Sequence, residues 1–260
     1  MSLKTKRLLS RAKKLAKKGE IKQAKEIYSN ILKTFPNNLL AKKEIKLLEN
    51  EKALNPTQAQ LDEVMRFYSS GEIEQALECV ESLIKEYPNE YLLFNICGAC
   101  HSEIGSIEPA IENFKKAIAL KIDYSEAQFN LGVAFQKLNQ LDNASEYYLQ
   151  AINSQHAYPS AHNNLGIIFL NKGKIDAAVK SFEWAVAYSP NYAEAYNNLG
   201  SALQELKQFK NAKKQFEKAC SINPNYAQAF HNLGILSEIT NQPKDAVSQY
   251  ERAVEIEPEF

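Results

Sequence analysis

Apolar residues recur along this chain at helical spacing, and the pattern they form repeats every 34 residues. If each unit is numbered from 1, apolar or small residues occupy positions 3, 4, 7, 8, 10 and 11, and then positions 20, 24, 27 and 28. Steps of three and four place each set on one face of a helix. Polar residues near positions 14–17 separate the two sets, and proline near position 32 ends the second helix. Each unit is therefore predicted to be a helix-turn-helix.

Two columns of small residues fix the phase of the units. Position 8 is glycine in five successive units, with Val64 in its place in the unit before them, and position 20 is alanine in all six. Small residues allow the two helices of a unit to approach closely, where a larger side chain would overpack the contact. The glycines are Gly98, Gly132, Gly166, Gly200 and Gly234, and the alanines are Ala76, Ala110, Ala144, Ala178, Ala212 and Ala246.

With Leu-Gly at positions 7 and 8 and an aromatic residue at position 24, the 34-residue pattern resembles the tetratricopeptide repeat. The resemblance implies an all-α fold, a right-handed superhelical solenoid of helix-turn-helix units. Such solenoids usually bind their ligands along an extended concave face. The six consecutive units expected within residues 57–260 are 57–90, 91–124, 125–158, 159–192, 193–226 and 227–260.

The N-terminal part of the chain interrupts this array. Residues 1–38 carry a further, basic unit, whereas residues 39–56 do not fit the period and predict an inserted helix or linker that Asn55-Pro56 ends. We expect the solenoid to change direction at this insert or to form a hinge there. The apolar stripe predicted for the inserted helix is Leu40, Ala41, Ile45, Leu47, Leu48 and Leu54.

The charge of the chain is balanced overall but not along its length. The 31 Lys and Arg residues equal the 31 Asp and Glu residues, yet residues 1–55 hold 15 basic and 5 acidic residues. The segment Lys4–Lys18 combines a basic face with one apolar side. A helix of this kind can bind nucleic acid or an anionic lipid surface. The alternative is a solvated cap at the end of the array.

No motif predicts catalysis, a cofactor or a metal site, and we expect a non-catalytic protein. The chain has no glycine-rich phosphate loop, no H-E-x-x-H pair and no nucleophile turn. Cys97 and Cys100 form a C-x-x-C with no second pair for zinc, and we expect both to be buried like the apolar residues of other units. His162 falls where later units carry aromatic residues, so we expect it to pack as one.

Two further features bear on location and surface. The N-terminus lacks the apolar region of a secretory signal, and the four cysteines form no disulfide framework, so we expect a cytoplasmic protein. No stretch approaches the roughly 18 apolar residues of a membrane helix. Trp184 occupies a second-helix position that is polar in the other units, and we expect it to be exposed.

The resemblance also implies a binding surface, because the first helix of each tetratricopeptide unit lines the groove at positions 2, 5, 6, 9, 12 and 13. Asparagine recurs at position 6 in four successive units and at position 5 in three. An asparagine amide is both donor and acceptor, so a row of them can pair with the main chain of an extended peptide. Apolar groove residues would contact its side chains. The predicted peptide-binding residues are Asn95, Asn130, Asn163, Asn164, Asn197, Asn198 and Asn232, with Phe129, Val133, Ile167, Leu170 and Ile235.

The segment Tyr192–Gly200 resembles the repeats of O-linked N-acetylglucosamine transferases. That resemblance implies an asparagine ladder that binds the backbone of a substrate peptide. The alternative is that the asparagines only bridge adjacent helices, and the sequence leaves both interpretations open.

These observations favour a protein–protein interaction scaffold that binds an extended segment of an unidentified partner in its groove. One alternative is the N-terminal substrate-recognition module of a longer enzyme, a glycosyltransferase, sulfotransferase-like protein or dioxygenase, truncated at residue 260. This alternative arises because repeat arrays need a polar cap and none follows the last unit. The other is a self-associating scaffold that uses the uncapped C-terminal helix or Trp184.

Overall fold

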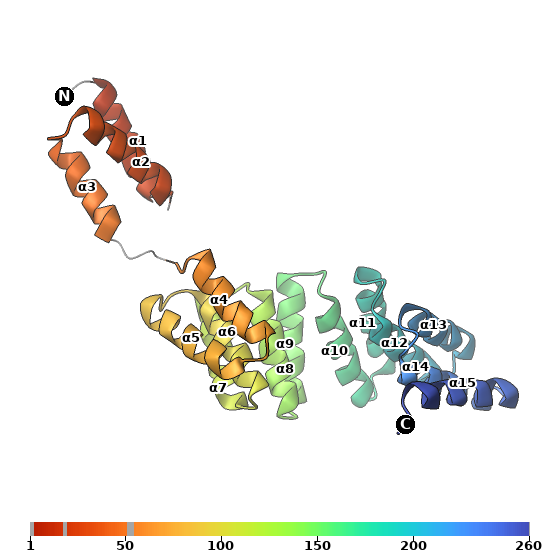
Figure 1. Ribbon diagram of the computed structural model, residues 1–260. Helices are drawn as coiled ribbons and strands as arrows, with labels where there is room; N and C mark the ends of the chain where they lie inside the picture. Colours follow the sequence, from red (N-terminus) through yellow and green to blue (C-terminus); the bar gives the residue numbers. More distant parts are fainter. Residues whose placement is uncertain (1–2, 18–19, 51–54, 260) are drawn as a thin grey trace. The chain divides into compact units, whose positions relative to one another are not determined.

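The computed structural model describes residues 3–17, 20–50 and 55–259, and every regular element in these ranges is an α-helix. The chain divides into two compact units, Met1–Asp62 and Glu63–Phe260 (Figure 1). None of the described helices has both the length and the apolar character of a membrane span. The all-α repeat fold predicted from the sequence is confirmed, whereas a change of direction or a hinge at the insert stays a prediction.

The N-terminal unit contains α1 (Leu3–Lys17), α2 (Ile21–Thr34) and α3 (Leu39–Asn50). Helix α1 packs on α2, and α2 packs on α3. Tyr28 of α2 is the largest side chain buried at their centre, where it shares a cluster with Ala12 of α1. The basic residues of α1 whose side chains are described lie on its exposed face, as the amphipathic pattern predicts. They are Lys6, Arg7, Arg11, Lys13 and Lys14.

The apolar stripe predicted for the inserted helix is narrower than expected. Ala41 and Leu48 of α3 are buried in the cluster around Tyr28. Leu40 and Leu47, by contrast, are 48% and 50% exposed, because only one face of α3 meets α2. Leu54 of the same predicted stripe lies outside the described residues.

From α4 onward, two described helices fall within each stretch of 34 residues. The division between the two compact units falls within the first of these helices. From residue 91 onward the two helices of each 34-residue unit pack together, and the second helix of one unit packs on the first helix of the next. The helices of successive stretches are α4 (Gln58–Ser69) and α5 (Ile73–Glu86), α6 (Tyr91–Glu103) and α7 (Ile107–Leu120), α8 (Ser125–Lys137) and α9 (Leu141–Ser154), α10 (Pro159–Asn171) and α11 (Ile175–Tyr188), α12 (Ala193–Glu205) and α13 (Phe209–Ile222), and α14 (Ala227–Ile239) and α15 (Pro243–Ile256).

The glycine column lies against the aromatic residues at position 24. A Cβ atom built on Gly98 would lie 2.6 Å from a ring carbon of Phe114, and one built on Gly234 would lie 2.4 Å from Tyr250. The first helix can approach the second this closely only where position 8 lacks a side chain. The unit that carries Val64 instead also has a smaller residue at position 24, Val80, and both valines are fully buried. The predicted role of the glycines in close packing is confirmed.

The turn between the two helices of each unit has one repeated conformation. Position 15 takes a positive φ, between 55° and 80°, in all six units of residues 57–260. The amide of the next residue then donates to the carbonyl of position 11, as Lys174 does to Phe169 at 2.8 Å. This six-residue closure is the Schellman motif, which satisfies carbonyls at the end of a helix. The residues at position 15 are Gly71, Gly105, Asn139, Gly173, Lys207 and Asn241.

The first helices of successive units also contact one another directly, at α6–α8, α10–α12 and α12–α14. In a curved stack, the elements on the inner side come closer together than those on the outer side. The first helices therefore line the inner face, where the sequence predicts a groove.

Candidate functional site

The predicted asparagines form hydrogen bonds between successive units. The position-6 amide nitrogen donates to the side-chain oxygen of the position-5 asparagine in the preceding unit. The three bonds run from Asn130 to Asn95 at 3.1 Å, from Asn198 to Asn163 at 3.0 Å and from Asn232 to Asn197 at 2.8 Å. The asparagines thus bridge adjacent first helices, as one of the two sequence-based interpretations holds. We call these residues, together with Asn164, the asparagine ladder.

The position-5 asparagines are buried in the interior of the repeat units. Asn95, Asn163 and Asn197 are 3%, 0% and 4% exposed. A side chain this buried cannot contact a peptide in the groove, so the prediction that these three residues bind one is corrected. Their amides satisfy each other in the interior, as buried polar groups must.

A tyrosine and a carboxylate complete the buried end of the network. Asn95 donates to the hydroxyl oxygen of Tyr124 at 3.2 Å and to a carboxylate oxygen of Glu126 at 3.1 Å, and Tyr124 donates to the other oxygen of Glu126 at 3.0 Å. Asn163 donates in the same way to Glu194 at 3.1 Å. These acids belong to position 2 of the following unit, so each carboxylate orients the asparagine of the unit before it.

Burial perturbs the tyrosines of this network. Burial raises the pKa of Tyr124, and the adjacent carboxylate of Glu126 raises it further. Burial and the carboxylate of Glu194 also raise the pKa of Tyr192. Hydrogen bonds with Ser160 and Asn163 lower it, but by less. Both hydroxyls therefore stay protonated at neutral pH and are hydrogen-bonding groups.

The ladder is interrupted once, at the middle of the array. Phe129 occupies position 5 there and stacks on Tyr158, with ring centres 5.1 Å apart. Asn164, which has no asparagine opposite it, donates instead to the hydroxyl of Tyr148 at 3.1 Å. That hydroxyl in turn donates to Gln136 at 2.7 Å. Asn164 is thus held by a partner that keeps a second hydrogen bond of its own.

The position-6 asparagines are only partly buried, and one side of each amide is available. Within the described ranges, the side-chain oxygens of Asn130, Asn164 and Asn198 accept no hydrogen bond, whereas that of Asn232 accepts one from Gln228 at 3.2 Å. The apolar residues that the sequence predicts for the groove are also half-buried. They are Phe129, Val133, Ile167, Leu170 and Ile235.

His162 and Trp184 form an aromatic cluster with Tyr188 at the outer side of α10 and α11. Trp184 stacks on Tyr188 with ring centres 5.5 Å apart and an interplanar angle of 17°, and it is 53% exposed, as predicted. His162 is buried beneath both rings, which confirms that it packs as an aromatic residue. Burial lowers the pKa of His162, and this favours the neutral ring.

The cysteines are free thiols, and the two of the C-x-x-C are buried as predicted. Burial raises the pKa of Cys97 to about 12 and that of Cys100 to about 11. Thiols with such values are protonated at neutral pH and are poor nucleophiles. Neither one has the environment of a catalytic cysteine.

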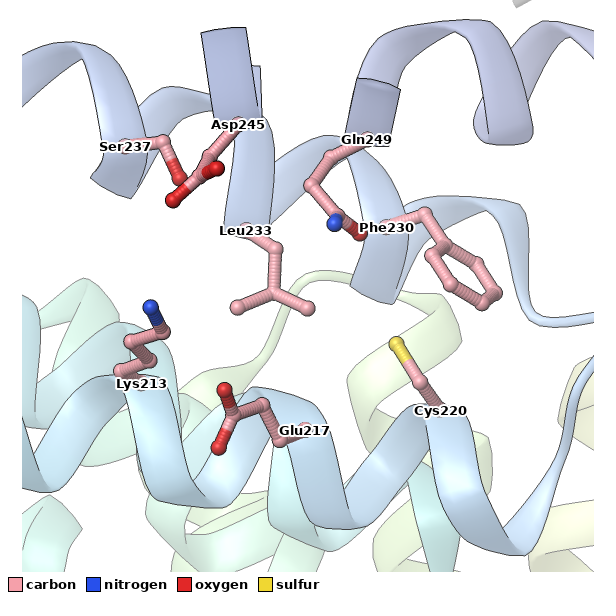
Figure 2. Close-up of a pocket in the computed structure, with 8 residues that line it drawn as sticks. All are labelled: Lys213, Glu217, Cys220, Phe230, Leu233, Ser237, Asp245 and Gln249. Atoms are coloured by element: carbon pink, nitrogen blue, oxygen red, sulfur yellow. The ribbon is translucent and has the colours of Figure 1, made fainter. Parts of the chain in front are cut away.

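A cavity of about 380 Å³ lies between α13, α14 and α15 (Figure 2). Ser237, which lines it, occupies position 11, where the three preceding units carry the larger Phe135, Phe169 and Leu203. None of the predicted groove residues lines it. The lining residues are Lys213, Glu217, Cys220, Phe230, Leu233, Ser237, Asp245 and Gln249.

The pairing of position-2 acids with buried asparagines was not predicted from the sequence. The signal for it is present, because Asn95 and Asn163 at position 5 are each followed by a glutamate at position 2 of the next unit, Glu126 and Glu194. Where position 5 is Phe129, the next position 2 is Ser160.

Two models of tetratricopeptide repeats match the chain. A tetratricopeptide repeat model matches residues 125–155, 193–226 and 227–260, and a TPR repeat model matches residues 102–139 and 168–207. Together the matches cover more than half of the chain. The chain belongs to the tetratricopeptide repeat family.

The curated relatives found by sequence are peroxisomal targeting signal receptors. The receptor of Candida albicans is 29% identical over 101 residues, which is 36% of this chain and 17% of the receptor. The receptor of Saccharomyces cerevisiae is 29% identical over 98 residues, 38% of this chain and 16% of the receptor. The match thus spans about a sixth of the length of these relatives.

Several solved structures share the fold. Pseudomonas aeruginosa pilF aligns with a TM-score of 0.70 at 17% identity, over 77% of this chain and 91% of its own. YrrB, described as a TPR protein with an unusual peptide-binding site, aligns with a TM-score of 0.59 at 20% identity, over 70% of this chain and 94% of its own. Cut9 in its complex with Hcn1 aligns with a TM-score of 0.68 at 18% identity, over 97% of this chain and 53% of the other.

Proposed function

We propose that this protein is a non-catalytic scaffold that binds an extended peptide segment along the inner face of its tetratricopeptide units. The position-6 asparagines hold the main chain of the peptide, and the half-buried apolar residues between them contact its side chains. Recognition through the main chain gives a loose sequence preference.

The observation that carries the proposal is the hydrogen bonding of the position-6 amides, whose nitrogens are paired and whose oxygens are mostly not. Each one is fixed by a hydrogen bond to the preceding unit, and Asn130, Asn164 and Asn198 keep a side-chain oxygen that the described residues leave unpaired. An amide that is already oriented loses little conformational freedom on binding, so the hydrogen bond it makes contributes more to affinity. The bridging role and the ligand role are thus compatible.

The relatives support a peptide ligand. The similarity to peroxisomal targeting signal receptors is in line with a protein that binds a peptide signal, and YrrB has a peptide-binding site on a related fold. Glu126 and Glu194 give this inner face acidic character, so we expect a peptide with some basic residues to bind best. We also propose that the protein acts in the cytoplasm.

Asn164→Ala is the variant that tests this proposal with the least disturbance of the fold, because Tyr148 keeps its bond to Gln136 when the amide is lost. The probe is a fluorescent peptide selected on the wild-type protein from a random library. We expect the variant to weaken its binding about three- to tenfold, the value of one hydrogen bond.

The matched control is Asn143→Ala, the same substitution on an exposed site of the second helix α9. It should leave affinity unchanged. Equal affinity of wild type and Asn164→Ala, or failure of the library to yield any peptide that binds, would contradict the proposal.

A second candidate function is self-association through α15. Val179 and Val186 of α11 are partly buried in the contact with the next unit, whereas the corresponding Val247 and Val254 of α15 are 56% and 49% exposed. This apolar face fits the same face or another first helix of a second copy.

Light scattering at several concentrations tests self-association through α15. The measured mass should rise with concentration, and Val247→Lys should keep the protein monomeric. A constant monomer mass would contradict it.

A further inference from the structure

Three metal-ligating side chains meet at the contact between α5 and α6. They are Glu81 of α5 and Cys97 and His101 of α6, and one ligand atom of each lies within 4.8 Å of the other two. Cys97 and His101 stand four residues apart, so they lie on the same face of their helix. None of these three residues belongs to the asparagine ladder or to the proposed peptide site.

The repeat shows how unusual this combination is. Glu81, Cys97 and His101 occupy positions 25, 7 and 11, where the next contact of the same kind has Lys115, Leu131 and Phe135. Positions 25 and 11 do face each other there, because the ammonium of Lys115 lies 5.7 Å from the ring centre of Phe135. Position 7 is leucine in all four later units. At the contact between α5 and α6, the ligating residues Cys97 and His101 therefore replace the apolar residues that the next unit carries at positions 7 and 11.

The cluster has a buried side and an exposed side, as a binding site for an ion near the surface requires. Cys97 is 2% exposed, and the Nδ1 atom of His101 is buried without a hydrogen-bond partner in the described part of the chain. Glu81 lies on the exposed side. A buried nitrogen without a partner is unfavourable, and a cation would satisfy it. Because Glu81 is exposed to solvent, a water molecule is available as a further ligand.

We propose that Glu81, Cys97 and His101 form a binding site for Zn²⁺ or a chemically similar transition-metal ion. Thiolate and imidazole ligands select such ions over Mg²⁺ and Ca²⁺. One thiolate and one carboxylate balance the charge of a divalent ion, and the thiol proton is released to solvent on binding. Three protein ligands and one water make the four-coordinate arrangement that zinc adopts. The ion would join the unit 57–90 to the unit 91–124.

The required rearrangement is small. Metal–ligand bonds of about 2.0–2.3 Å place the atoms of a tetrahedral site about 3.5 Å apart, so they must close by roughly 1 Å. Cys97 and His101 are fixed by one helix, and the exposed side chain of Glu81 has the freedom to move toward them.

Titration of the full chain with Co²⁺ tests the proposal, because a thiolate ligand gives Co²⁺ an intense charge-transfer absorption. We expect one equivalent of Co²⁺ to produce this band, Zn²⁺ to abolish it by displacement, and Zn²⁺ to raise the melting temperature. Cys97→Leu and His101→Phe introduce the residues that other units carry at these positions, so both should fold. Each should weaken binding by more than about 100-fold.

Cys100→Ala is the control, since it changes the other thiol of the C-x-x-C to the residue found at the same position in the next unit, Ala134. It should keep both the absorption band and the effect of Zn²⁺ on melting. The proposal is overturned if the wild type shows no charge-transfer band, or if the band survives in Cys97→Leu.

Discussion

A Cβ atom added to Gly166 would lie 2.6 Å from Cε1 of Phe182, closer than two carbon atoms approach unless one of them moves. Phe182 is fully buried, so its ring cannot move aside without displacing other core residues. The same relationship recurs in five successive units, and it explains why glycine persists inside a helix, where it is unfavourable by about 1 kcal/mol relative to alanine.

Gly166→Ala should therefore destabilise the protein in spite of the better helix propensity of alanine. Overpacking costs about 1–3 kcal/mol in a well-packed core. The pair Val64 and Val80 suggests the compensating change, so Gly166→Ala combined with Phe182→Val should be less destabilised than the sum of the two single variants, by about 1 kcal/mol or more. Urea denaturation of the four proteins measures this coupling, and strict additivity would contradict the packing argument.

Lys207→Gly should stabilise the protein. Lys207 has a φ of 58°, in the left-handed region that disfavours residues with a side chain, whereas Gly71, Gly105 and Gly173 hold the same turn position in other units. We expect a gain of about 0.5–1 kcal/mol in the free energy of unfolding. Conversely, Gly173→Ala puts a side chain at this turn position and should lower the free energy of unfolding by a similar amount. If Lys207→Gly lowers the melting temperature, the turn is not under the expected strain.

Neighbouring asparagines should differ sharply in their effect on stability. Asn163 is fully buried, accepts a bond from Asn198 and donates one to Glu194, so Asn163→Ala leaves partners unsatisfied and should cost about 1–3 kcal/mol. Asn164→Ala should cost less than about 1 kcal/mol, because Tyr148 retains a second partner. Chemical denaturation distinguishes the two, and equal losses would show that the ladder is not layered as described.

Stability should fall at acidic pH in part through His162. Its pKa is lowered by burial, so between that value and about 6.5, the pKa of an unfolded histidine, the unfolded chain binds more protons than the folded one. The contribution of the neutral ring is therefore present above pH 6.5 and is lost as the pH falls through the folded pKa. His162→Phe, the residue found in the unit of Phe230, should flatten the dependence between pH 7.5 and 5. An unchanged slope would contradict this.

The sequence predicts the solenoid well because its signals are local and repeated. Helical spacing, Gly at position 8 and the polar break near position 15 recur in phase, so they predict the units around Gly132 and Gly200 from the sequence. The stripe of the inserted helix was predicted less well. Leu40 and Leu47 fit an amphipathic pattern, but the pattern does not say how many neighbours the helix has.

The site was harder to predict than the fold, because its geometry depends on contacts between units. Asparagines at positions 5 and 6 are adjacent in sequence, and only the stacking shows that Asn163 is fully buried while Asn164 is partly exposed. The cluster of Glu81, Cys97 and His101 was missed for the same reason, since its members come from two units and no single-helix motif contains them.

The central claim is that the position-6 asparagines bind the main chain of a peptide, and a double-mutant cycle between protein and ligand tests it most directly. The affinity of the selected peptide is compared with that of versions N-methylated at single amides, each on wild type and on Asn164→Ala. One N-methylation should weaken binding to wild type about three- to tenfold and have no further effect on Asn164→Ala, because both changes remove the same hydrogen bond. If every N-methylation weakens binding to the two proteins equally, Asn164 does not hold the peptide backbone.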